Sequence, residues 1–321
     1  MGQMGITARV DRITEIESPY RGSYLPAPRS CKIELTGRCN YACSFCARSM
    51  VLREQKDMER PLFERLLREM RDAGVEEIGL FYLGESFLCD WLEEAIAFAK
   101  QECGYPYVFL TTNGSLATPE RLDGCFRAGL DSLKFSFNYA DEAQFKDIAK
   151  VKGALFRRML ENIEAAKAVR DRVFGQTGHR CGLYASYIEY DGDQGARMRE
   201  ALQQIQGCVD QIYALPLYNQ ANLVTDDEMK RGWQPTAGNR GRVDALRDPL
   251  PCWAVFTEAH ITWDGKLSAC CFDHDGRFHM GDLARAPFMQ AWNSPSFQAL
   301  RQAHLAKDVT GSPCESCVAY S

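Results

Sequence analysis

The sequence predicts an α/β fold, in which six β/α units form a parallel sheet and a small domain of a β-hairpin and short helices follows. Strand-like and amphipathic helix-like segments alternate between residues 31 and 216. Each crossover helix returns the chain to the same sheet edge, so successive strands run parallel, and right-handed crossovers curl the sheet toward a barrel. From residue 252 onward the pattern changes to a hairpin and short helices.

The elements of the expected barrel follow from short apolar runs and from apolar stripes at helical spacing. We expect strands at Lys32–Leu35, Ile78–Leu83, Tyr107–Thr111, Ser132–Phe137, Gly182–Tyr190 and Gln211–Leu215. We expect helices at Pro61–Arg71, Leu88–Cys103, Pro119–Ala128, Phe156–Val169 and Ala196–Gln206. Functional residues of such sheets lie at the C-terminal ends of the strands, and we expect the site there.

The remaining segments complete a four-part division of the chain. Residues 1–30 form an N-terminal extension, residues 31–216 the barrel, and residues 252–321 the C-terminal domain. Residues 217–251 are rich in glycine and proline, and they either drape over the barrel mouth or form a simple surface linker. In the last domain, His260–Trp263 and Lys266–Cys270 predict a hairpin on a two-residue Asp264-Gly265 turn. Short helices follow near Pro287–Trp292 and Ser296–His304.

The composition narrows the class of protein. The chain has 321 residues, a formal net charge of −5 and no dense Lys/Arg run, so we expect no nucleic-acid partner. We find neither a signal peptide nor an apolar stretch of about 18 residues, so we expect a cytoplasmic protein without a membrane partner. Fourteen cysteines in a reducing compartment indicate metal or redox chemistry rather than disulfides.

A first cysteine group follows directly after the first expected strand. Cys39, Cys43 and Cys46 can hold three irons of a [4Fe–4S] cube, which leaves the fourth iron open to a small molecule. Two alternatives stay open at this point. The same spacing forms one stripe of a helix with three buried cysteines, and three thiolates also suit zinc with a fourth ligand elsewhere.

The spacing Cys39-x3-Cys43-x2-Cys46 resembles the cluster motif of the radical S-adenosylmethionine (radical SAM) superfamily, and the resemblance extends over about residues 31–216. It implies a partial (β/α)6 barrel and S-adenosylmethionine as cofactor. It also implies that the cluster, reduced by an external donor such as flavodoxin or ferredoxin, cleaves the cofactor to a 5′-deoxyadenosyl radical. That radical then takes a hydrogen atom from the substrate.

Further positions resemble the cofactor contacts of this superfamily. The residues concerned are Phe45 near the adenine, Gly84 and Glu85 at the methionine amino group, and Asn113, Ser136 and Asn138 beside the ribose. Taken alone, the same residues also fit turns, caps and solvated carboxylates. Leu83 and Ser86 depart from the family's Gly-Gly-Glu-Pro motif, and the arginine that many relatives use for the cofactor carboxylate is absent. Lys146, Lys150 and Lys152 are the basic residues nearest to its place.

A second cysteine group lies in the C-terminal domain. Cys252, Cys270, Cys314 and Cys317 supply a closed four-thiolate site, which suits zinc or an iron–sulfur cube. The pattern resembles the twitch domain, a shortened SPASM domain, with a spacing similar to that of the 2-deoxy-scyllo-inosamine dehydrogenases. This resemblance implies an auxiliary [4Fe–4S] cluster that is fully ligated by protein and transfers electrons. We interpret the adjacent Cys271 as a bystander.

Together these resemblances imply a radical SAM oxidoreductase that passes a substrate electron to the auxiliary cluster, for example in oxidising an alcohol to a carbonyl. Because 38 residues precede Cys39, we expect no added peptide-binding domain there and favour a small polar substrate such as a sugar or aminocyclitol. The alternatives are oxidation or cross-linking of a peptide or protein, and a non-enzymatic iron–sulfur or zinc sensor. Candidates for substrate contact or proton transfer, each also open to a structural role, are Tyr187, Glu189, Asp273 and His274.

Overall fold

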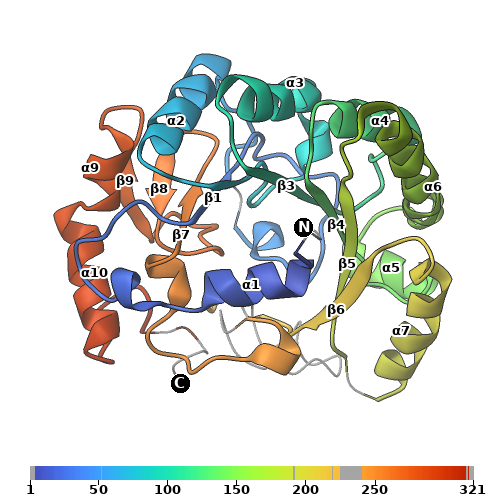
Figure 1. The fold of residues 1–321 in the computed structure, drawn as a ribbon. Coiled ribbons are helices and arrows are strands. Elements are labelled where there is room, and N and C mark those ends of the chain that lie inside the picture. Colours follow the sequence, from blue (N-terminus) through green and yellow to red (C-terminus); the bar gives the residue numbers. More distant parts are fainter. Residues whose placement is uncertain are drawn as a thin grey trace.

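The computed structural model describes residues 4–51, 53–190, 192–218, 220–224, 241–315 and 317. Its centre is one continuous sheet with the strand order β6-β5-β4-β3-β2-β1-β7-β8-β9. Strands β1 to β6 run parallel in sequence order, and the sheet curves so that helices cover its outer face (Figure 1). The predicted fold class is therefore confirmed.

The six predicted barrel strands are present with shifted ends. They are β1 (Ser30–Ile33), β2 (Glu77–Gly79), β3 (Tyr107–Thr112), β4 (Ser132–Ser136), β5 (Gly182–Ile188) and β6 (Gln211–Leu215). The largest difference is at β2, which ends four residues before the predicted Leu83. Here the Ser86 hydroxyl donates to the carbonyl of Leu80 at 2.7 Å, so the chain turns off the sheet into the loop that carries Gly84 and Glu85.

The outer helices bury the predicted apolar stripes. They are α2 (Arg60–Asp72), α3 (Leu92–Ala97) with a π-helical turn at Phe98–Glu102, α4 (Pro119–Arg127), α6 (Ala154–Thr177) and α7 (Gly192–Ile205). On α2, for example, Phe63, Leu66 and Met70 are buried against the sheet. Helix α5 (Glu142–Ala149) was not predicted, and it packs beside the first cysteine loop. None of the helices within the described ranges is both long and apolar enough to cross a membrane.

The C-terminal domain extends the barrel sheet rather than forming a separate one. Strand β7 (Glu258–Ile261) pairs parallel with β1, and β8 (Lys266–Ser268) and β9 (His279–Asp282) continue antiparallel, followed by α9 (Phe288–Trp292) and α10 (Pro295–Leu305). The predicted two-residue turn is wrong. The Thr262 N–H donates to the Lys266 carbonyl at 3.0 Å, so three residues form the loop, and its last residue, Gly265, has φ +79°.

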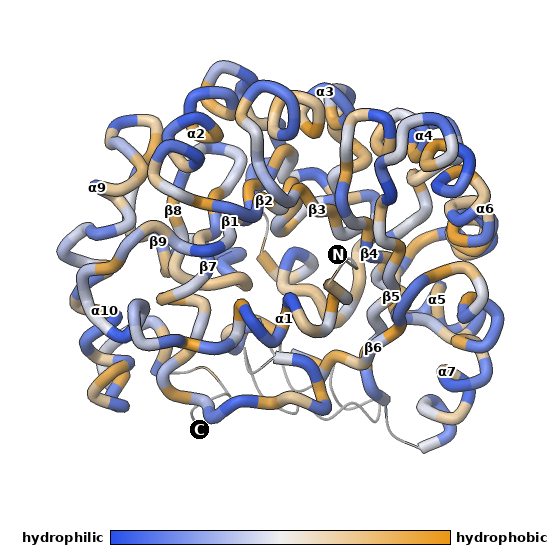
Figure 2. The backbone as a smooth tube through the Cα atoms, in the orientation of Figure 1, coloured by the Kyte–Doolittle hydropathy of each residue, from blue (hydrophilic) through white to orange (hydrophobic). Residues whose placement is uncertain are grey.

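An N-terminal helix, α1 (Ile6–Thr14), lies across the barrel at the N-terminal ends of the strands (Figure 1). Arg9 forms an ion pair of 2.6 Å with Glu77 at the start of β2 and stacks over the ring of Tyr107 at the start of β3. The helix combines hydrophilic and hydrophobic residues (Figure 2), and Ile6, Val10 and Ile13 face the barrel interior. The helix therefore closes the end of the barrel opposite the first cysteine loop.

The segment between barrel and C-terminal domain is described in part. Tyr218 donates to the Gly241 carbonyl at 2.8 Å, and Arg242 forms an ion pair of 2.9 Å with Asp11 of α1. The predicted bridge over residues 217–251 lies outside the described residues at position 219 and from 225 to 240.

Candidate functional site

The first three cysteines lie in the loop between β1 and α2, which is not helical, so the helix-stripe alternative does not apply. Burial raises the pKa of the Cys39 thiol to about 12, and the nearby Glu85 carboxylate raises it further. Burial also raises the pKa of Cys43, with added contributions from the thiols of Cys46 and Cys39. The three thiols are therefore electrostatic neighbours in a partly buried loop.

The cysteine loop is held by backbone and side-chain contacts. The N–H groups of Ala42 and Ser44 donate to carbonyls of α5 at 3.0 and 2.9 Å, and the Cys43 thiol lies 2.9 Å from the Tyr139 hydroxyl. Over the described part of the chain, no three His, Cys, Asp or Glu side chains already stand at metal-ligand spacing. The three thiols fit a cube with three protein ligands, because each thiolate of such a cube binds a separate iron.

Gly84 brings the loop after β2 into contact with the cysteine loop. A β-carbon at this position would lie 2.1 Å from the Thr36 carbonyl oxygen and 2.7 Å from that of Arg38. In addition, the Glu85 N–H donates to the Arg38 carbonyl at 2.8 Å. Glycine is therefore required here, because no side chain fits between the two backbones.

Glu85 is a buried carboxylate, 3 % exposed, at the junction of β2 and β3. It accepts the Thr112 hydroxyl at 2.7 Å and the backbone N–H groups of Asn113 at 2.8 Å and Phe87 at 3.2 Å. Burial raises its pKa, and these three donors partly offset the rise. Two carboxylate oxygens offer about four acceptor positions, so this fixed group has capacity for one more donor, such as a cationic amine.

A ring of hydrogen bonds ties the end of β3 to the cysteine loop. The Asn113 amide donates to Asn40 at 2.8 Å, Asn40 donates to the Ser115 hydroxyl at 2.9 Å, and Ser115 donates back to the Asn113 side-chain oxygen at 2.8 Å. Asn40 and Ser115 were not among the predicted site residues, although Asn40 directly follows Cys39. The ring fixes the predicted ribose contact Asn113 beside the cluster loop.

The other predicted cofactor contacts lie at the same edge of the sheet. Ser136 ends β4 in register with Ser186 of β5, and the Asn138 carbonyl accepts the Tyr190 hydroxyl at 3.0 Å. Phe45 lies within the cysteine loop and packs against the core. Since the C-terminal ends of parallel strands meet at one edge, the loops bring the predicted adenine, ribose and methionine contacts to one side of the barrel.

The second cysteine group also comes together. Burial raises the pKa of Cys314, and the thiols of Cys252, Cys270 and Cys317 raise it further, in that order. His304 of α10, which the sequence analysis missed, accepts the Cys252 N–H at 3.2 Å and lies 3.3 Å from the Cys314 sulfur. Burial lowers the pKa of this histidine to about 4, so it is a neutral neighbour of the thiols. Four thiols fit a cube that is closed to substrate.

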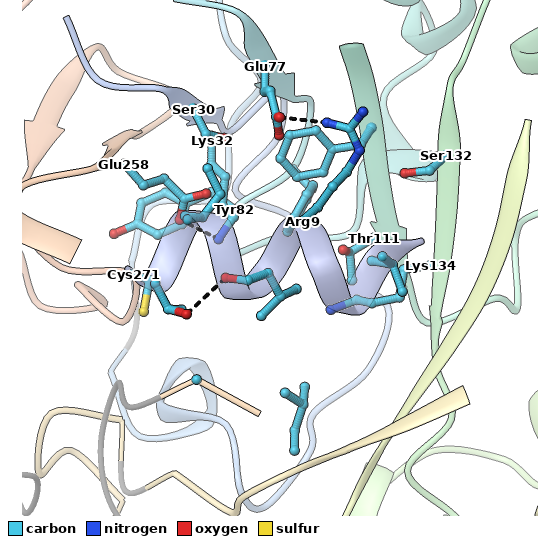
Figure 3. Close-up of a pocket in the computed structure, with 18 of the residues that line it drawn as sticks. Arg9, Ser30, Lys32, Glu77, Tyr82, Thr111, Ser132, Lys134, Glu258 and Cys271 are labelled. Carbon is cyan, nitrogen blue, oxygen red and sulfur yellow. Dashed lines mark hydrogen bonds and ion pairs between the residues drawn. The ribbon is translucent and has the colours of Figure 1, made fainter. Parts of the chain in front are cut away.

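A cavity of about 290 Å³, partly open to solvent, lies inside the barrel between α1 and the C-terminal domain (Figure 3). Inward residues of the strands line it together with residues 271 and 272, so Cys271 faces this cavity. Lys32 of β1 and Glu258 of β7 form an ion pair of 2.6 Å in its wall. The Tyr82 hydroxyl, also in the wall, donates to the Cys270 carbonyl and so links the cavity to the second cysteine group.

The four residues predicted for substrate contact or proton transfer lie outside this cavity lining. Tyr187 and Glu189 line a separate hollow beside α7. Asp273 is fully buried, where it accepts the Ser268 hydroxyl at 2.7 Å and the Phe278 N–H at 3.3 Å. His274 is buried, and burial followed by the charges of two nearby arginines lowers its pKa to about 3. These positions favour structural roles.

Two family models match the chain in regions that contain the two cysteine groups. Residues 33–179 match the radical SAM superfamily, and residues 252–318 match an iron–sulfur cluster-binding domain known as SPASM. The PqqA peptide cyclase of Gluconobacter oxydans is 30 % identical over 315 residues, which cover 91 % of this chain and 84 % of that protein. The GTP 3′,8-cyclase of Synechococcus sp. is 28 % identical over 283 residues, which cover 76 % of this chain and 79 % of that protein.

Solved structures share the fold at low sequence identity. BtrN in complex with AdoMet and 2-DOIA gives a TM-score of 0.60 at 16 % identity, with 90 % of this chain and 92 % of that chain covered. Streptococcus suis SuiB bound to the precursor peptide SuiA gives a TM-score of 0.64 at 15 % identity, and the match covers 98 % of this chain and 72 % of that chain. The two matched families imply S-adenosylmethionine and two [4Fe–4S] clusters as cofactors. The chain therefore belongs to the radical SAM superfamily and carries a C-terminal iron–sulfur cluster-binding domain.

Proposed function

We propose that this radical SAM enzyme is an oxidoreductase that dehydrogenates a small polar alcohol, such as a sugar or a cyclitol, inside the barrel. The observation that carries the proposal is the small barrel cavity of about 290 Å³ with charged and hydroxyl side chains in its wall. Its volume is at the low end of the range for small-molecule sites, about 300–1,000 Å³. Helix α1 covers one end of the barrel, which favours a compact substrate over an extended chain.

In this proposal the bound cofactors supply the hydrogen-abstracting radical and the electron acceptor, and an external one-electron donor such as flavodoxin or ferredoxin reduces the first cluster. Residues 31–216 form the catalytic barrel and residues 252–321 the auxiliary-cluster domain, with an extension at residues 1–30 and a bridge at 217–251. Cys39, Cys43 and Cys46 hold the first cluster, and the cofactor contacts are Phe45, Gly84, Glu85, Asn113, Ser136 and Asn138. Cys252, Cys270, Cys314 and Cys317 hold the second cluster.

The chain's own part is to orient the substrate and to exclude water. Glu85 offers its buried carboxylate to the cofactor's amine, and the ring of Asn40, Asn113 and Ser115 keeps that edge rigid. The ion pair of Arg9 with Glu77 holds α1 over one end of the barrel and so limits access of water from that side. The same fold in BtrN, in complex with AdoMet and 2-DOIA, supports a small molecule as substrate.

A second candidate is modification of a peptide or protein by oxidation or cross-linking. The 30 % identity to a PqqA peptide cyclase over 91 % of the chain favours it, and so does the fold shared with SuiB bound to its precursor peptide. The small volume of the cavity and the position of α1 across one barrel end argue against this candidate, because a peptide segment needs a longer groove or a displaced α1.

The test is anaerobic reconstitution of the full chain, reduction with dithionite and incubation with S-adenosylmethionine. We expect 5′-deoxyadenosine and, with a panel of sugars and cyclitols, a product two mass units lighter that forms a hydrazone with a carbonyl reagent. Release of 5′-deoxyadenosine without any small-molecule product, together with a mass loss in a co-incubated peptide, would favour the second candidate. Intact clusters with no 5′-deoxyadenosine would sink both proposals.

A further inference from the structure

The wall of the barrel cavity contains more positively charged side chains than negatively charged ones. Arg9 is paired with Glu77 at 2.6 Å, and Lys32 is paired with Glu258 at 2.6 Å. The Glu258 oxygen that Lys32 contacts, Oε2, also lies 3.0 Å from the buried His260 ring. Lys134 also lines the cavity, and no carboxylate of the described residues pairs with it. The described cavity wall therefore holds three cations against two anions.

Lys134 is placed to use its charge inside the cavity. It lies in the middle of β4, and Thr111 is its register partner on the neighbouring strand β3. Both side chains line the cavity, and Figure 3 shows the amine and the hydroxyl extending into it from adjacent strands. An ammonium and a hydroxyl side by side form a small donor pair that matches two oxygens of one anionic group.

The environment makes an anion favourable at this point. Burial lowers the pKa of Lys134 to about 8, and the positive charge of Lys32 adds to this effect, whereas Glu258 opposes it. A buried cation without a counter-charge destabilises the folded protein, and a bound anion relieves that penalty. Lys134 of strand β4 thus carries a charge that has no ion-pair partner among the described residues, although Glu258 acts on it from a greater distance.

We propose that Lys134 and Thr111 bind an oxyanion group of the substrate, a carboxylate or a phosphate, inside the barrel cavity. The proposal rests on the proposed function in one respect, that the cavity is the substrate site. It narrows the substrate class to polar alcohols that carry an acidic group, and it disfavours cationic aminocyclitols, whose ammonium groups Lys134 repels. Lys134 is then a specificity residue, two positions before the predicted cofactor contact Ser136 on the same strand.

The test measures binding without turnover. The anaerobically reconstituted holoenzyme, with S-adenosylmethionine and without reductant, is titrated calorimetrically with D-glucuronate, D-glucose 6-phosphate, D-glucose and D-glucosamine. These probes share a hexose scaffold and differ in the acidic, neutral or basic group. We expect at least one acidic probe to bind about tenfold more tightly than D-glucose, and D-glucosamine to bind most weakly. Whichever acidic probe binds more tightly, D-glucuronate or D-glucose 6-phosphate, shows whether the site prefers a carboxylate or a phosphate.

Substitutions test whether Lys134 and Thr111 cause the preference for acidic probes. K134M should remove the preference for the acid, K134R should keep most of it, and T111V should reduce it partly. K167M is the matched control, because Lys167 is exposed on the outer face of α6, and it should behave as the wild type. Iron content and circular dichroism confirm that each variant is folded and loaded.

Three results would overturn the proposal. The first is an acid preference that survives K134M, and the second is no acidic probe binding better than D-glucose. The third is a weaker affinity for S-adenosylmethionine in K134M with substrate probes unaffected, because Lys134 would then serve the cofactor's carboxylate. Since no reductant is present, none of these results depends on radical formation, which the 5′-deoxyadenosine assay tests separately.

Discussion

The carboxylate of Glu85 accepts the backbone N–H of Asn113 at 2.8 Å, which joins the loop after β2 to the end of β3. The same carboxylate raises the pKa of Cys39 through its charge. The buried carboxylate of Glu85 therefore accepts hydrogen bonds at the end of β3 and also raises the pKa of a thiol in the cysteine loop. We expect this position to couple the fold of that edge to the binding of a cationic group.

Replacing Glu85 by glutamine should weaken S-adenosylmethionine binding by about tenfold or more, because the charge-assisted contact to the cofactor's amine is lost. Equilibrium dialysis against labelled cofactor measures the change, with iron content expected to stay at the wild-type level. The matched control is T112V, which removes one donor to Glu85 and keeps the negative charge. Equal affinities in wild type and E85Q would mean that Glu85 is only structural.

Substituting Gly84 by alanine should displace the cysteine loop, because the new β-carbon would overlap two backbone carbonyls of residues 36 and 38. We expect the iron content to fall from about eight to about four per chain, since the second site is untouched. Iron analysis and electron paramagnetic resonance of the reduced protein check this. The control is G175A, whose β-carbon meets nothing within 4 Å on the helical surface of α6. A fully loaded G84A protein would refute the argument.

Replacing Cys314 by serine should remove the second cluster and leave the first. We expect about four irons per chain, with 5′-deoxyadenosine still formed and the oxidised product lost, because the electron acceptor is missing. Product analysis by mass spectrometry with parallel iron counts gives the measurement. Unchanged product formation at half the iron content would exclude an electron-transfer role for that cluster.

The K134M variant should be more stable than the wild type, even though it binds acids poorly. The pKa of Lys134 is lowered in the folded state, so its protonated form destabilises the fold at every pH below about 8. We expect the apparent Tm at pH 7 to rise by about 2 °C or more, and the gain to shrink as the pH rises above 8. Differential scanning calorimetry without ligand decides this, and a lower Tm would contradict it.

Binding of the acidic probe should weaken as the pH rises through about 8. In the free protein Lys134 loses its proton there, and with it the charge that attracts the anion. Glu258 opposite has a pKa of about 2, held down by Lys32 and His260 against the effect of burial, so it does not titrate in this range. Calorimetric titrations from pH 6.5 to 9.5 should show the loss in the wild type and a flat profile in K134R.

Much of the fold was predictable because local patterns determine it. The six strands and the helices around residues 60, 119 and 154 follow from apolar runs and stripes that tertiary contacts do not override. The spacing also predicted that the cysteines of each group lie near one another, which the mutual effects of their thiols on their pKa values bear out, whereas their binding of clusters stays a prediction. The pairing of β7 with β1 was not predictable, because the paired residues are more than 220 positions apart in the sequence and no local signal encodes their register.

The interior of the site was the least predictable part. Lys134 lies in the middle of a short strand between Leu133 and Phe135, and only the curvature of the sheet shows that it faces a cavity. Tyr187 and Glu189 had the expected chemistry and the expected strand, but the pleat directs them to the hollow beside α7. Helix α1 was missed because its apolar residues gain their partners from the strand ends of the distant barrel.

The parallel pairing of β7 with β1 has a consequence for how the molecule is organised. A curled sheet that stopped at β1 would leave a row of unsatisfied N–H and C=O groups along that border, open to another chain. Because β7 occupies the border, the regions that match the two families share one sheet, and loss of the C-terminal region would expose the edge of β1.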